Sequence, residues 1–180
     1  MFGPDPEFRA SAEQNSSPGE RGQATPMKID AVDRAILAVL QKDAGLSNKE
    51  LARKIRLAPS SCLQRVRRLR EEGAIRGLHA DVSPEALGIG LQAIIAVRLA
   101  HHLEKDVVSF RRQLHERHEV VNTYYVSGGV DFFVHVVVRD VDHLRLLGVE
   151  AFTSHRLVSH VETSLIFEHQ RSNQFPDLTK

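Results

Sequence analysis

The sequence predicts an α+β chain that combines an N-terminal winged helix-turn-helix domain with a C-terminal βαββαβ domain of the ferredoxin-like class. Two patterns support this prediction: three short helical periods within residues 28–79, and alternating strand and helix patterns from residue 90 onward. A third observation is that basic charge is concentrated in the first of these parts. The chain has 180 residues, of which 42% are hydrophobic, enough for one domain or two small ones.

Clear start signals mark the three expected helices. Asp30 is a good N-cap for the first helix. Ser47 and Glu50 form a capping box that opens the second helix. Pro59 suits the first position of the third helix, which should run until Gly73 provides a C-terminal stop.

The rest of the chain carries the signature of an antiparallel sheet with two helices. Residues 74–82 should be extended, and 80–89 should form a hinge. The alternation then predicts four strands and two helices in the order βαββαβ, which implies a four-stranded antiparallel sheet backed by the helices. The expected ranges are strand 90–100, helix 104–118, strand 120–126, strand 131–138, helix 141–152 and strand 157–167.

The expected domain limits follow from these patterns and from composition. Residues 1–27 are rich in Pro, Gly, Ser, Glu and Gln without a hydrophobic period, so we expect them to be disordered. Residues 28–79 should form the helix-turn-helix domain, 80–89 the hinge and 90–180 the second domain.

The charge distribution points to nucleic acid. The overall net charge is only +1, but residues 28–79 carry +6 while 80–180 carry −3. A basic block of this kind beside an acidic one is typical of a domain that binds DNA. A row of arginines on an isolated helix is more often a solvated face, but here the capping box and the turn with its proline point the same way.

The third helix is the expected reading helix. Cys62, Val66 and Leu69 should face the core, which leaves the opposite side free to enter the major groove of double-stranded DNA. Arg can bond to guanine and Gln to adenine, whereas cations on the preceding helix would hold phosphates. The candidate DNA-binding residues are Ser60, Ser61, Gln64, Arg65, Arg67 and Arg68 on the third helix, and Lys49, Arg53 and Lys54 on the second.

A glycine-rich turn between two strands is the best candidate for a small-molecule site. Ser127, Gly128 and Gly129 can expose backbone N–H groups to a carboxylate, and Asp131 can accept from an ammonium group. Tyr124 lies close by on the preceding strand. From the residues alone an ordinary hairpin turn is the better explanation of this motif, because Gly-Gly-x-Asp occurs in many turns.

Other classes of function lack support in the sequence. We find no nucleophile–base pairing, phosphate loop or cysteine–histidine metal set, so we expect no enzyme activity, no cofactor and no metal. No apolar run approaches the ~18 residues of a membrane span. The single cysteine, Cys62, excludes an intrachain disulfide and fits a cytoplasmic protein.

Three stretches together give the sequence a family resemblance. They are DAVDRAILAVLQKDAGLSNKELARKIRLAPSSCLQRVRRLREEGAIRG, VSGGVDFFVHVVV and VETSLIFE, and they resemble the Lrp/AsnC (feast/famine) transcription regulators. The resemblance covers 28 to about 168. It implies dimers that are joined through their sheets and often assemble further, commonly to octamers. It also implies an amino-acid effector bound at the interface between effector domains, near the glycine turn and Thr163. The sequence departs from the family at three places. Ala58 replaces a serine cap, Gly129 replaces a polar residue of the turn, and the segment 157–160 replaces a proline-glycine turn.

We therefore expect a sequence-specific DNA-binding regulator that responds to an amino acid or a similar small metabolite. Two alternatives remain open at this point. The first is an architectural protein that wraps DNA with little sequence preference. The second is a metabolite-binding module whose helical domain contacts protein instead of DNA.

Overall fold

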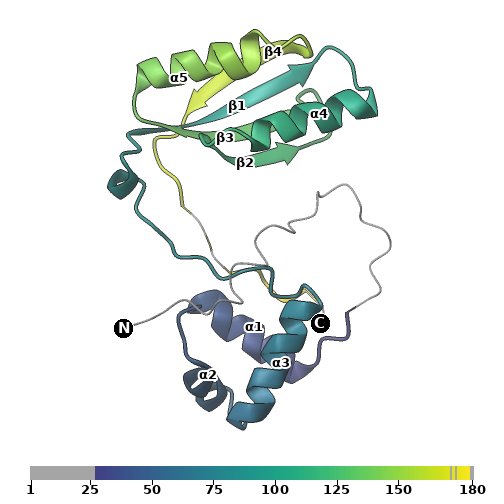
Figure 1. The fold of residues 1–180 in the computed structure, drawn as a ribbon, viewed down its shortest axis with the longest axis vertical. Coiled ribbons are helices and arrows are strands. Elements are labelled where there is room, and N and C mark those ends of the chain that lie inside the picture. Colours follow the sequence, from purple (N-terminus) through teal and green to yellow (C-terminus); the bar gives the residue numbers. More distant parts are fainter. Residues whose placement is uncertain (1–26, 171, 173, 179–180) are drawn as a thin grey trace. The chain divides into compact units, whose positions relative to one another are not determined.

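The computed structural model describes residues 27–170, 172 and 174–178 (Figure 1). Residues 1–27 were expected to be disordered, and all of them except Met27 lie outside the described residues. The chain divides into two compact units. The first comprises the chain up to His79 together with the C-terminal residues after Ser172, and the second spans Ala80–Ser172. Residues 174–178 belong to the first unit, whereas the sequence pattern had assigned them to the second.

The helical unit contains α1 (Ala31–Lys42), α2 (Asn48–Lys54) and α3 (Pro59–Glu71). Both α1 and α2 begin with a capping box, in which the N-cap side chain accepts from the backbone N–H three residues on. Pro59 occupies the first turn of α3, and Ala58 before it provides no side-chain cap. The start signals predicted from the sequence are therefore confirmed.

A small hydrophobic core holds these three helices together. Its fully buried members come from every helix: Ile36 from α1, Leu51 and Ala52 from α2, and Cys62 and Leu69 from α3. Burial raises the pKa of the Cys62 thiol, so this cysteine acts as a small core residue and not as an exposed thiolate. After Gly73 the segment 74–82, expected to be extended, contains no helix or paired strand, and the next regular element is the short 3₁₀ turn Glu85–Leu87.

The second unit is built on one antiparallel sheet. Its strands are β1 (Leu91–Leu99), β2 (Val120–Tyr125), β3 (Phe132–Val138) and β4 (Val158–Leu165). They lie in the order β2-β3-β1-β4, which is the arrangement expected for βαββαβ connectivity. Gly90 immediately precedes β1 and passes so close to the Arg139 carbonyl that a Cβ there would lie 2.3 Å from its oxygen.

Two helices cover one face of this sheet, as Figure 1 shows: α4 (Glu104–His115) and α5 (Val141–Leu147). Alternate β1 residues from Ala93 to Leu99 point into the core together with Phe110 and Leu114 of α4. α4 ends three residues earlier than expected. The second predicted helix is also divided, because α5 passes at Gly148 into a π-helical turn that ends at Thr153.

The opposite face of the sheet carries a mixed set of side chains. Phe133 is exposed, while His135 is buried between Gln92 and Asn122, with its Nε2 2.9 Å from Gln92 Oε1. Ile94 and Ala96 on the same face are half-buried. No helix in the described part of the chain is long and apolar enough to cross a membrane.

Candidate DNA interface and effector turn

The outer face of α3 presents short polar, amide and basic side chains together. Ser60, Gln64 and Arg67 are exposed at positions that share one side of the helix, and Ser61 is half-buried beside them. Cys62, Val66 and Leu69 are buried on the other side, as predicted. This division leaves a helix face that can enter a groove while the apolar side stays on the core.

Leu63 is a member of this outer face that the sequence interpretation missed. Leu63 is 40% exposed and lies on the same side of α3 as Ser60 and Arg67. A leucine in a helical period is ordinarily assigned to the core, and only its position one residue after Cys62, outside the spacing of Cys62, Val66 and Leu69, signals otherwise. An exposed apolar side chain in this place can contact a thymine methyl group.

The turn between α2 and α3 fixes how the two helices meet. The Asn48 side chain donates from Nδ2 to the Pro59 carbonyl oxygen at 2.8 Å, which ties the start of α2 to the start of α3. Arg56 adopts a left-handed backbone with φ of 56° in this turn, a conformation that glycine favours. Lys49, Arg53 and Lys54 are all exposed on α2, where the sequence placed the phosphate contacts.

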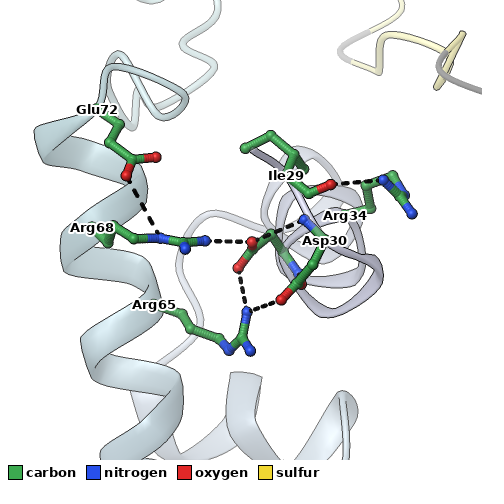
Figure 2. A network of polar contacts seen from close by, with 7 residues as sticks. Ile29, Asp30, Arg34, Arg65, Arg68 and Glu72 are labelled. Carbon is green, nitrogen blue, oxygen red and sulfur yellow. Dashed lines mark hydrogen bonds and ion pairs between the residues drawn. The ribbon is translucent and has the colours of Figure 1, made fainter. Parts of the chain in front are cut away.

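Arg65 and Arg68 are held by acidic residues of the same chain. Figure 2 shows both side chains extending from α3 toward the start of α1. Arg65 donates to Asp30 Oδ2 at 2.6 Å and to Asp33 Oδ1 at 2.8 Å, and these hydrogen bonds raise its pKa. Arg68 donates to Asp33 Oδ2. The sequence had placed Arg68 on the outer face, and the structure instead turns its guanidinium inward.

The glycine turn is a compact feature between β2 and β3. Gly128 has φ of 119°, which a side chain would strain, and Ser127 and Gly129 are exposed beside it. Asp131 is only 8% exposed, and both of its carboxylate oxygens are engaged within the chain. Oδ2 accepts from the Leu99 N–H at 2.7 Å, and Oδ1 lies 2.7 Å from His102 Nε2. Asp131 thus fixes the turn against β1.

A cation next to this turn was not anticipated. Arg98, exposed near the end of β1, donates from Nε to the Gly129 carbonyl oxygen at 2.6 Å. Its guanidinium therefore lies against the glycine turn, where it adds a positive charge that a carboxylate could use. Sequence reasoning missed Arg98 because it precedes the turn by about thirty residues, and only the β1–β3 pairing brings the two together.

The structure separates Tyr124 from Thr163, the two outlying members of the predicted effector site. Tyr124 pairs with Phe133 on the edge strand β2, on the face opposite the helices. Thr163 pairs with the buried Ile95 from the other edge strand, β4, and so shares the helix-covered face. Within one chain these two residues cannot line the same pocket. Among the described residues, no group of three or more His, Cys, Asp and Glu could hold a metal ion.

Two family models match the chain. One, described as winged helix-turn-helix DNA-binding, matches residues 29–76. The other, described as the Lrp/AsnC ligand binding domain, matches residues 92–174. The two matches coincide with the helical unit and with the sheet unit.

Individual relatives agree with these matches over most of the chain. The HTH-type transcriptional regulator AldR of Mycolicibacterium smegmatis is 41% identical over 86% of this chain and 91% of its own length. The crystal structure of MtbAldR superposes with a TM-score of 0.71 at 37% identity, over 82% of this chain and 97% of that one. A transcriptional regulator of Neisseria meningitidis, solved in complex with L-methionine, gives a TM-score of 0.77 at 27% identity, over 83% and 97%.

Proposed function

Because this chain belongs to the Lrp/AsnC family of transcription regulators, we propose that it recognises a specific operator sequence and that an amino acid modulates this binding. Family membership establishes that the chain is a DNA-binding transcription regulator with a domain of the amino-acid-binding type, and that it is not an enzyme. Its place of action is then the cytoplasm, where bacterial operators lie.

The observation that carries the proposal is the outer face of α3. Gln64 and Arg67 can form bidentate contacts with base edges, Leu63 can meet a thymine methyl, and Ser60 and Ser61 let the helix start approach the backbone. Lys49, Arg53 and Lys54 supply phosphate contacts from α2. Arg65 and Arg68, whose guanidinium groups are bound to Asp30 and Asp33, are not part of this set.

The proposed effector is an α-amino acid held at the glycine turn. Its carboxylate would meet the backbone N–H groups of Gly128 and Gly129 and the guanidinium of Arg98. The regulator from Neisseria meningitidis, which was solved with L-methionine, supports this class of ligand. Asp131 contributes by holding the turn, with one lone pair on each oxygen left for an ammonium group.

We also propose that the working form is at least a dimer, with further assembly possible up to an octamer. The face of the sheet opposite α4 and α5 carries Ile94, Ala96 and Phe133, which a second sheet would cover. Because Tyr124 and Thr163 lie at opposite edges and faces of one sheet, a site that uses both must draw them from different subunits.

A competition titration tests this function. The purified protein is added to DNA from upstream of its own gene and to scrambled DNA of equal length at about 150 mM salt, with and without each of the twenty amino acids. We expect at least ~10³-fold preference for the specific DNA, shifted by one or a few amino acids. Equal binding to both DNAs would contradict sequence-specific regulation and favour an architectural protein, and a preference that no amino acid moves would contradict the proposed effector.

A further inference from the structure

Asp33 is a fully buried carboxylate in the first turn of α1, and α3 supplies its partners. Its side chain is 0% exposed, yet it lies among charged groups instead of apolar ones. Oδ1 accepts from Arg65 at 2.8 Å, and Oδ2 accepts from Arg68 and from the Asp30 backbone N–H at 3.1 Å. A buried carboxylate is stable only when paired in this way, so both arginines are required by the fold of the helical unit.

Asp30 extends the network at its exposed side (Figure 2). Its Oδ1 caps α1 by accepting from the Asp33 N–H at 2.8 Å, while its Oδ2 accepts from Arg65 at 2.6 Å. A single guanidinium nitrogen, Arg65 Nη1, therefore binds two carboxylates, one of them the helix cap. On its other side Arg68 lies near Glu72 of the same helix, with its Nε 3.9 Å from the Glu72 carboxylate, an ion pair too long for a hydrogen bond.

These contacts conflict with a role in base reading. Arg65 or Arg68 could reach a guanine only by turning its guanidinium away from Asp33, and the carboxylate would then be left buried and unpaired. The two aspartates also neutralise the two arginines, so neither adds a free charge for phosphate. Arg67, which lies between them in sequence, is exposed, and within the described part of the chain no carboxylate pairs with it.

We infer that Arg65 and Arg68 are positioning residues: through Asp30 and Asp33 they lock α3 against the start of α1 and so set the angle at which Gln64 and Arg67 meet DNA. This inference rests on the proposed DNA reading by α3 and refines it. It makes Asp33, a residue remote from the outer face, a determinant of operator specificity.

The variant Asp33→Asn distinguishes arginines that position α3 from arginines that bind DNA, because only the second role predicts a rise in DNA affinity. If the arginines only position α3, removing the buried charge loosens the helix: the thermal midpoint falls, DNA affinity stays equal or falls, and the slope of log K against log salt is unchanged. If the arginines bind DNA, the same variant frees Arg68 from Asp33 and leaves Arg65 bound to Asp30 alone. Affinity would then rise and the salt slope would steepen by about 0.9 per new phosphate contact, which would overturn the inference.

A matched pair on α3 keeps the test decisive even if Asp33→Asn fails to fold. Arg65→Gln and Arg67→Gln remove the same charge two positions apart. At a temperature where both variants are folded by circular dichroism, Arg67→Gln should lower the salt slope by about 0.9 or relax the preference at one base pair, and Arg65→Gln should leave the slope unchanged. A drop of about 0.9 for Arg65→Gln would contradict the positioning role.

The ratio of operator to scrambled-DNA affinity separates positioning from a merely structural role. Loosening α3 should lower this ratio several-fold in Arg65→Gln, and Arg65→Lys, which keeps a cation near Asp30, should restore part of it. A ratio equal to that of the wild type in folded Arg65→Gln would overturn the inference. A wild-type protein that binds no DNA would instead refute the proposed function. Failure of the inference and failure of the proposed function are therefore distinguishable.

Discussion

Asp30 serves two parts of the helical unit with one carboxylate. One oxygen caps α1 through the Asp33 N–H, and the other binds Arg65 on α3. Both contacts favour the ionised form, and they lower the pKa of Asp30 to about 2, with the backbone hydrogen bond as the larger cause. A group whose pKa is lower in the folded than in the unfolded state stabilises the fold only while it is ionised.

This shift predicts a defined acid sensitivity of the helical unit. The stabilisation by Asp30 should be complete above the unfolded pKa near 4 and should disappear as the pH falls toward 2. Urea unfolding between pH 2 and 6 should therefore show wild type and Asp30→Asn converging at the acid end, separating between about pH 2 and 4, and differing by a constant amount above that. A constant difference between them over the whole range would contradict this account.

At the scale of elements, the tight turn between α2 and α3 holds a residue in an unfavourable conformation. Arg56 has φ of 56°, whereas glycine reaches this region without a steric penalty. The strain persists because α2 and α3 are fixed on both sides, by their shared core and by the Asn48 contact to Pro59.

We expect Arg56→Gly to stabilise the helical unit by about 0.5–1 kcal/mol. The relief of left-handed strain is worth about 1–2 kcal/mol, and the greater freedom of glycine in the unfolded chain offsets about half of it. Arg56→Ala is the control: it removes the same charge but keeps the strain, so it should give no such gain in urea unfolding. Equal stabilisation by both variants would assign the effect to charge instead of backbone conformation.

The boundaries of these elements show what local sequence signals can and cannot predict. The caps at Asp30 and Ser47 and the proline at the start of α3 act through residues within one turn, so they could be read directly. The π-helical turn after α5 could not, because a hydrophobic period does not distinguish it from a continuing α-helix.

The residues of the candidate site also fall into those that local signals predict and those that depend on contacts between distant segments. The exposure of Gln64 and Arg67 follows from the helical period of α3 alone. The inward turn of Arg68 depends on Asp33, thirty-five residues earlier, and the position of Arg98 beside the glycine turn depends on strand pairing. Such contacts between distant segments cannot be deduced from one sequence without first knowing how its elements pack.

At the scale of the whole molecule, the two units have separate hydrophobic cores that share no residue. One core positions α3, and the other positions the glycine turn. Such separation would let each unit keep its own geometry if, as proposed, an amino-acid effector changes how α3 is presented to DNA.

Selection of preferred DNA sequences from a random pool shows whether the outer face of α3 reads the operator. The wild type, Gln64→Ala and Arg67→Ala would each be offered a pool of randomised duplexes under identical salt. We expect a defined preference for the wild type and, in each variant, roughly tenfold weaker discrimination at one or two base pairs, because a bidentate contact contributes about 1–3 kcal/mol. Variants that keep the wild-type preference at every position, or a wild type with none, would contradict reading of the operator by this face.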